Sequence, residues 1–301
     1  MKVDLEKVKE FGNIELLAKQ MVEGFITGLH KSPYHGFSVE FAEHRLYNTG
    51  ESTRHMDWKV FAKTDRLYVK RYEEETNLRC QVVIDNSSSM YYPVENFGKI
   101  RFSVLASAAL AYLLHKQRDA VGLFTFSDKI ELQTQTKSTT AHINKLFVHL
   151  GQLLRETQGQ KQTKVASVIH QIADKIHRRS LVLIFSDMFQ DKKRMDEIFS
   201  ALQHLKHNKH EVLLFHVTDK ITELDFDFED RPYEFVDLES DTRLKLTPTN
   251  IKTTYRTKID QYYNELKLRC GQLKIDFIEA DVKDDFDKIL SSYLIKRSRM
   301  R

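Results

Sequence analysis

From residue 80 onward, short apolar runs alternate with amphipathic segments of helical length, and this alternation restricts the fold more than any other feature of the chain. The apolar runs are CQVVID (80–85), AVGLFTFSD (120–128), SLVLIFSDM (180–188), HEVLLFHVTD (210–219) and KIDFIEAD (274–281). Buried strands that alternate with helices are typical of a parallel sheet whose two faces are both covered. Because such crossovers are right-handed, we predict an α/β fold with a doubly wound, mostly parallel, Rossmann-type sheet.

Two parts of the chain are predicted to fold differently. Residues 79–301 carry the alternating pattern and form the sheet domain, with a hairpin insertion near 221–249. In residues 1–78, apolar side chains recur at helical spacing between residues 5 and 29, which predicts an N-terminal helix. The same part is expected to supply a small β subdomain that packs on the sheet domain. Its strands are predicted at 37–41 and 66–73, and the hairpin could join them.

Composition narrows the classes of function. The chain has 47 Lys and Arg against 43 Asp and Glu, a formal net charge of +4, so no nucleic-acid partner is expected. No apolar run approaches the roughly 20 residues that a membrane span needs, and the N-terminus lacks the apolar block of a secretory signal. Two cysteines, Cys80 and Cys270, make no disulfide framework, so we predict a reduced, cytoplasmic protein.

Polar side chains follow two of the predicted strands at the point where each strand ends. Asp85, Ser87 and Ser89 alternate after the first strand, and Asp187 ends the third strong strand. Thr163 lies in the loop GQKQTKVAS, where a helix begins. Because the carboxyl ends of parallel strands meet at one edge of a sheet, near its switch point, we expect these side chains to converge.

Oxygen atoms of this kind suit a hard divalent cation. Mg²⁺ prefers oxygen ligands in near-octahedral geometry and retains waters, and Mn²⁺ or Ca²⁺ are alternatives. The hydroxyls of Ser87, Ser89 and Thr163 could bind the ion directly. Asp85 and Asp187 could bind it directly or hold coordinating waters. The protein would then leave one position of the ion open, and a carboxylate of a partner protein could fill it.

Other roles compete for the same residues. Asp85-Asn86-Ser87-Ser88 also has the composition of a helix N-cap or a turn. Thr163 is also an ordinary N-cap for the helix that follows it. In that case Thr139 or Thr140 would be the ligand from the third loop.

The proposed ligands resemble the metal-ion-dependent adhesion site of von Willebrand factor A domains. That site combines Asp-x-Ser-x-Ser after the first strand, a threonine on a later loop and an aspartate after the fourth strand. The matching residues here are Asp85, Ser87, Ser89, Thr163 and Asp187. The glycines usual before the threonine are replaced by KQT. The resemblance implies a von Willebrand factor A-like domain, the same doubly wound fold that periodicity predicts, and a divalent ion held by these residues.

The upstream stretch FSVEFAEHRLYNTGESTRHMDWKVFAKTDRLYVKRYEEE is similar to the signature of a bacterial family catalogued as domain of unknown function fifty-eight. The matching positions are Arg45, Tyr47, Gly50, Arg54, Asp57, Trp58 and Ala62. This resemblance implies an adaptor or co-chaperone of a MoxR-type AAA ATPase. Such a protein would bind the ATPase or its client, and the ion would be a docking point without a catalytic role.

A metal-dependent phosphatase or phosphotransferase is the alternative function, because a strand-end aspartate beside hydroxyls and magnesium also suits phosphoryl transfer. The haloacid-dehalogenase pattern requires a second aspartate where Ser87 stands. The chain also lacks the Gly-x-x-x-x-Gly-Lys-Ser/Thr loop of nucleotide hydrolases and the Gly-x-Ser-x-Gly nucleophile elbow. We therefore predict a protein-binding module that is not an enzyme. Binding by surface shape alone, without an ion, is a third hypothesis.

Overall fold

The computed structural model describes residues 14–29, 44–46, 58–70, 78–94, 98–155, 164–189, 192–238, 242–284 and 286–299. The chain divides into two compact units. Residues 28–77 form the smaller unit, and residues 1–27 group with 78–301 in the larger one. The predicted packing of residues 1–78 on the sheet domain stays a prediction for the smaller unit, residues 28–77.

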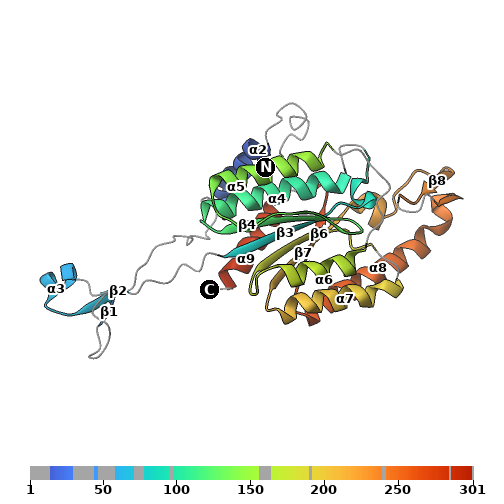
Figure 1. The fold of residues 1–301 in the computed structure, drawn as a ribbon. Coiled ribbons are helices and arrows are strands. Elements are labelled where there is room, and N and C mark those ends of the chain that lie inside the picture. Colours follow the sequence, from blue (N-terminus) through green and yellow to red (C-terminus); the bar gives the residue numbers. More distant parts are fainter. Residues whose placement is uncertain are drawn as a thin grey trace. The chain divides into compact units, whose positions relative to one another are not determined.

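A six-stranded sheet is the centre of the larger unit (Figure 1). Its strands are β3 (Arg79–Asp85), β4 (Ala120–Phe126), β5 (Ile130–Gln133), β6 (Leu181–Ser186), β7 (Glu211–Thr218) and β10 (Asp276–Asp281). They lie in the order β10-β7-β6-β3-β4-β5; the first five are parallel, and β5 is antiparallel to β4. The chain extends the sheet from β3 toward β5 and then returns to β6 on the other side of β3. The switch point therefore lies between β3 and β6, and the predicted doubly wound α/β fold is confirmed.

Helices cover both faces of this sheet (Figure 1). One face carries α2 (Ile14–Leu29), α4 (Gly98–Lys116), α5 (Thr140–Leu153) and α9 (Asp287–Arg299). The other face carries α6 (Val165–Lys175), α7 (Lys192–His207) and α8 (Pro248–Gln272). Side chains are buried on every side of α4, which is typical of a helix enclosed by other elements. No helix among the described residues is long and apolar enough to cross a membrane.

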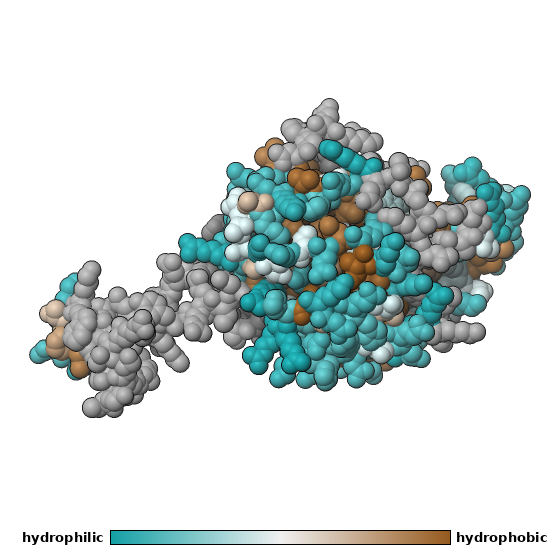
Figure 2. All heavy atoms as spheres, in the orientation of Figure 1, coloured by the Kyte–Doolittle hydropathy of each residue, from teal (hydrophilic) through white to brown (hydrophobic). Residues whose placement is uncertain are grey.

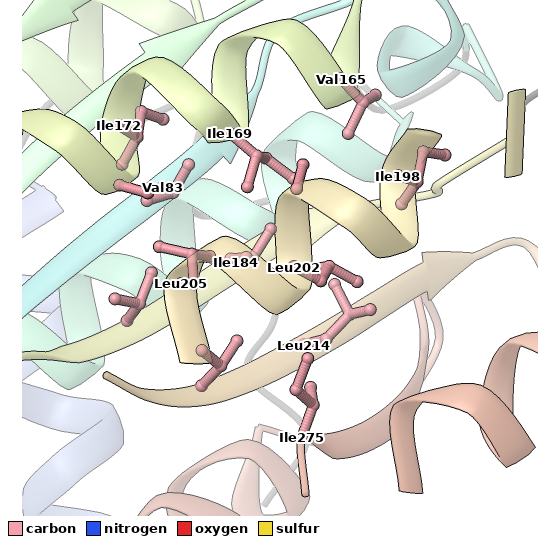
Figure 3. Packing of buried hydrophobic residues seen from close by; sticks show 14 of the residues in the cluster. Val83, Val165, Ile169, Ile172, Ile184, Ile198, Leu202, Leu205, Leu214 and Ile275 are labelled. Atoms are coloured by element: carbon pink, nitrogen blue, oxygen red, sulfur yellow. The ribbon is translucent and has the colours of Figure 1, made fainter. Parts of the chain in front are cut away.

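The core beneath α6 and α7 shows how sequence spacing fixes the packing (Figure 3). Val165, Ile169 and Ile172 recur at helical spacing on α6, and all three side chains are buried. They contact Val83 and Ile184 of the sheet within one hydrophobic cluster. Burying each such side chain stabilises the fold by roughly 1.5–3 kcal/mol relative to its exposure. The outer surface over α6 and α7 is largely hydrophilic (Figure 2).

The predicted hairpin is present as β8 (Tyr233–Val236) and β9 (Arg243–Leu246), which pair with each other as a two-stranded antiparallel sheet. Phe226 anchors it, since its ring lies 4.3 Å from that of Tyr255 on α8 and 5.7 Å from that of Phe235 on β8. In the smaller unit, β1 (His44–Leu46) pairs with β2 (Tyr68–Lys70), and α3 (Trp58–Thr64) lies between them in the chain.

The expectation that the hairpin joins the N-terminal strands was wrong for the described residues, because β1-β2 and β8-β9 are separate sheets. The two hairpin strands pair with each other, and the ring of Phe235 stacks on Phe226, which in turn contacts Tyr255 of α8. The predicted strand at 66–73 contains β2. The predicted strand at 37–41 lies outside the described residues.

Candidate metal centre

The two predicted carboxylates come together at the switch point of the sheet. Asp85 is the last residue of β3, and Asp187 directly follows β6. These strands are hydrogen-bonded neighbours in parallel register, with Ile84 opposite Phe185, so they end at the same edge. Both carboxylates are buried, with exposed fractions of 0% for Asp85 and 4% for Asp187.

The loop after β3 gathers its hydroxyls around these carboxylates. Asp85 Oδ1 accepts the backbone N–H of Ser87 at 3.0 Å, and Asp85 Oδ2 accepts the hydroxyl of Ser186 at 2.7 Å. Ser87 Oγ and Ser89 Oγ lie 3.1 Å apart, and the Ser89 hydroxyl bonds to the Asp187 carboxylate. The structure thus brings together four of the predicted site residues.

The turn and N-cap readings of this loop have different outcomes. Asp85 does close a turn, because its carboxylate accepts the N–H two residues ahead. Ser87 precedes the short 3₁₀ helix η2 (Ser88–Tyr91), but its side chain makes no capping hydrogen bond. The hydroxyl of Ser87 therefore does not cap η2.

The predicted third-loop ligand, Thr163, lies outside the described residues. Lys164, the next residue, donates its backbone N–H to the carbonyl of Ser127, directly after β4, at 3.2 Å. The alternative prediction, that Thr139 or Thr140 is the ligand from the third loop, was wrong. Lys137 bridges to Val121 at the start of β4, whereas Asp85 pairs with Phe126 at its end. Because β5 runs back along β4, the chain has returned to the opposite edge of the sheet before α5 begins.

Lys99 is a buried charge beside these carboxylates that the sequence pattern did not indicate. It lies in the first turn of α4 and is 1% exposed. Its ammonium donates to Asp187 Oδ2 at 2.8 Å and to Glu223 Oε1 at 2.5 Å. One signal could have found it: Lys99 is a charge at the start of a helix whose residues from 102 to 111 are apolar or small on all sides.

Glu223, at the start of an acidic segment that runs to residue 235, is a second charged side chain at this site that the sequence pattern did not indicate. Glu223 belongs to η4 (Lys220–Leu224), a π-helical turn that follows β7. Only 20% of its side chain is exposed. Its Oε2 accepts the N–H of Asp219 at 2.8 Å, and its carbonyl accepts the hydroxyl of Tyr255 at 2.8 Å. We call Asp85, Lys99, Asp187 and Glu223 the charged cluster.

A glycine sets the position of Lys99. Gly98 has φ +56°, and a Cβ built there would lie 2.5 Å from the carbonyl oxygen of Tyr92. The Lys99 N–H donates to that same oxygen at 3.0 Å. A side chain at position 98 would therefore push apart the two segments that bring Lys99 to the carboxylates.

Ionisation differs sharply within the charged cluster. Burial, together with the neighbouring charge of Asp187, raises the pKa of Asp85 to about 7. Burial also opposes ionisation of Asp187, but the Lys99 ammonium outweighs it and holds the pKa of Asp187 below its usual value. Burial lowers the pKa of His216 to about 4, so this residue is neutral at pH 7 and donates from Nε2 to the carbonyl oxygen of Asp187, 2.8 Å away.

The charges of the cluster leave a deficit of positive charge. When ionised, its three carboxylates face one ammonium, so two negative charges are in excess. Within the described residues, Asp85 makes no ion pair, and uncompensated buried charge is costly. One divalent cation would balance the excess, and carboxylate and hydroxyl oxygens suit Mg²⁺.

The oxygen donors therefore fit a hard cation, but only if hydroxyls take part. The described residues contain no group of three or more His, Cys, Asp or Glu side chains arranged to hold a metal ion. A surrounding network holds the loop in place: Tyr91 donates to Asn86 at 2.7 Å, and Asn86 and Ser127 donate to the two carboxylate oxygens of Glu131 at 2.7 and 2.8 Å. Such supporting bonds orient the residues that would touch an ion.

Comparison with known proteins identifies the family. Residues 43–266 match the family described as "Protein of unknown function DUF58". The chain belongs to this family. The family resemblance read from the upstream stretch is thereby confirmed. Of the signature residues, Trp58 and Ala62 lie in α3, and Arg45 lies in β1. Tyr47, Gly50, Arg54 and Asp57 lie outside the described residues.

Three solved structures and two curated relatives resemble this DUF58 chain. The uncharacterized proteins Rv1480 of Mycobacterium tuberculosis and Mb1516 of Mycobacterium bovis are each 24% identical over 206 residues, 68% of this chain. The match spans 63% of the length of these relatives, less than two thirds.

BatB from Bacteroides thetaiotaomicron shares 10% identity, with 74% of this chain and 99% of BatB covered and a TM-score of 0.43. The SpRpn10 VWA domain shares 10% identity, with 71% and 94% covered and a TM-score of 0.37. The pilus adhesin SpaC from Lactobacillus rhamnosus GG shares 12% identity, with 76% and 30% covered and a TM-score of 0.44.

Proposed function

We propose that this DUF58 protein is a metal-dependent protein-binding module. The observation that carries the proposal is the meeting of Asp85, Asp187 and the hydroxyls of the β3 loop at the switch point. Asp85, Ser87 and Asp187 are buried, Ser89 is half-buried, and the charged cluster carries more negative than positive charge when its carboxylates are ionised. A divalent cation, Mg²⁺ in the first instance and Mn²⁺ or Ca²⁺ as alternatives, is the ligand that this chemistry favours.

The proposed roles follow from what each side chain already does. The hydroxyls of Ser87 and Ser89 face each other and would bind the ion. Asp85 is oriented by Ser87 and Ser186 and would supply charge, directly or through waters. Asp187 would act beside it, and Thr163 is the proposed fifth ligand. When bound, the ion would supply a Lewis-acidic position that accepts a carboxylate oxygen of the partner.

The environment of Asp85 argues against phosphoryl transfer. A phosphatase of the haloacid-dehalogenase type needs a free aspartate nucleophile and a second aspartate two residues later. Here both oxygens of Asp85 accept hydrogen bonds, the side chain is fully buried, and the second position is Ser87. We therefore propose a role without catalysis.

The partner proposed from the family resemblance is a MoxR-type AAA ATPase or a client of that ATPase, in the cytoplasm and without nucleic acid. What supports the choice is membership of DUF58. A carboxylate on the partner would complete the coordination of the ion, so binding should require both the ion and Asp85.

Capture of a purified MoxR-type ATPase from the same organism tests the proposal. We expect Asp85→Ala to abolish capture in MgCl₂, and EDTA to abolish capture by the unchanged protein, because each removes the ion. Asp260→Ala, which removes an exposed aspartate of α8, is the matched control and should bind normally. Circular dichroism should show that all variants are folded. Capture that is indifferent to both Asp85→Ala and EDTA would exclude an ion-dependent contact.

A further inference from the structure

Lys99 is an unusual residue to find beside a cation site. Its side chain is almost completely buried, and its ammonium bridges carboxylates from two different segments. Asp187 follows β6, and Glu223 lies in η4 after β7. Burying an ammonium is costly unless it is paired, so these two contacts are what make the position tolerable.

The contacts of Asp187 show what an incoming ion would meet. Asp187 Oδ2 accepts the Lys99 ammonium at 2.8 Å, and Asp187 Oδ1 accepts the N–H of Phe189 at 3.2 Å. Both oxygens are therefore engaged, and the shared ammonium already offsets part of the charge of the carboxylate. A divalent ion that takes up Asp187 would come to lie near the ammonium, and like charges in a buried site repel strongly.

Glu223 offers the ammonium a second place. It already holds Lys99 at 2.5 Å, and Asp187 and Glu223 share the ammonium between them. Its other carboxylate oxygen is fixed by the N–H of Asp219, and its carbonyl by Tyr255 of α8. Lys99 can thus loosen its contact with Asp187 and remain paired.

We propose that Lys99 is a built-in cation that competes with the divalent ion for Asp187, with Glu223 retaining the ammonium when the ion is bound. The proposal rests on the proposed metal-dependent function and adds what regulates that site. In the protein without metal, the Lys99 ammonium stabilises the carboxylates. Because the ion must compete with this ammonium, it binds more weakly than it would to the same oxygen donors without Lys99. Binding of the ion would also shift the Lys99 ammonium toward Glu223. This shift would act on η4, which contains Glu223, and on its contact with Tyr255 of α8.

The net charge of the charged cluster in each variant predicts the order of the Mn²⁺ affinities. With all three carboxylates ionised, the charged cluster carries two excess negative charges; Lys99→Met would leave three, Glu223→Gln one, and the double substitution two. Isothermal titration of the full chain with MnCl₂ should follow this order. We expect Kd to fall at least about tenfold in Lys99→Met, to rise about tenfold in Glu223→Gln, and to return near the original value in the double variant.

A matched control removes the same charge elsewhere on α4. Lys116 is 45% exposed and lies 3.6 Å from Glu23, a surface pair of little energetic value. Lys116→Met should leave the Mn²⁺ affinity unchanged. In EDTA, Lys99→Met should lower the melting temperature because Asp187 and Glu223 lose their counter-charge, whereas Lys116→Met should not. If Lys99→Met does not fold, Glu223→Gln is the remaining test. Competition requires this variant to bind Mn²⁺ more weakly than the unchanged protein, and equal or tighter binding refutes it.

The outcomes separate this proposal from the metal-dependent function. If the unchanged protein binds Mn²⁺ and Lys99→Met binds it no more tightly, competition is refuted and the metal-dependent function stands. If only Lys99→Met binds Mn²⁺, competition is upheld, and the metal-dependent function fails because the lysine has taken the place of the ion. If neither protein binds Mn²⁺, both are refuted.

Discussion

At the scale of single residues, Asp85 is held where its ionisation is unfavourable. The side chain is fully buried, faces Asp187, and has a pKa of about 7, far above that of an ordinary aspartate. The hydrogen bonds from Ser186 and Ser87 offset only part of this cost. Residues that destabilise a fold in this way are typical of binding sites, because the ligand supplies the missing charge.

Asp85→Asn should therefore stabilise the protein in EDTA. Because the folded-state pKa is raised, ionisation of Asp85 penalises folding progressively as pH rises from about 4 to about 7, and fully above that. At pH 8 we expect a gain on the order of 1–3 kcal/mol in the free energy of unfolding, shrinking toward zero near pH 4. Urea unfolding at several pH values measures it. An Asp85→Asn protein less stable than the original at pH 8 would contradict the assigned cost.

At the scale of elements, the ends and directions of strands decide which side chains can meet. Asp85 and Asp187 meet because β3 and β6 are parallel neighbours. Thr139 and Thr140 do not reach them because β5 reverses direction beside β4. The helices keep these strands in position through buried apolar contacts. For β6 and β7, these contacts come from α6 and α7.

Leu202 on α7 tests how strongly this packing contributes. It is 0% exposed within the cluster of Figure 3, so Leu202→Ala leaves a cavity and should cost about 2–5 kcal/mol in the free energy of unfolding. Leu268 on α8 is 64% exposed, and Leu268→Ala should change stability by no more than about 0.5 kcal/mol. Denaturant titration of both variants gives the comparison. Equal losses would mean that this core is not the principal support of the sheet.

At the scale of the whole molecule, an ion at the switch point should stabilise the larger unit. A ligand that binds only the folded state adds about 2.7 kcal/mol when its concentration is 100 times Kd. We therefore expect saturating MnCl₂ to raise the melting temperature of the full chain by several degrees relative to EDTA, and to leave that of Asp85→Ala unchanged. Differential scanning calorimetry measures both. An equal rise in the two proteins would point to binding elsewhere.

The fold could be predicted from the sequence because its strands are continuously apolar and its helices periodic, as at β6 and α6. Asp85 and Asp187 could be placed together because strand ends meet at a switch point. Glu223 could not, since it lies in an irregular turn where no periodicity tells which side chains face inward. The pairing of Lys99 with Glu223 also joins residues 124 positions apart, and no local pattern records such a contact.

Gly98 has a consequence for how this protein can vary among its relatives. The lysine of the charged cluster reaches its carboxylates only where the preceding residue has no side chain and a positive φ. We therefore expect the two residues to be retained together, so that a relative that keeps the lysine should also keep the glycine before it.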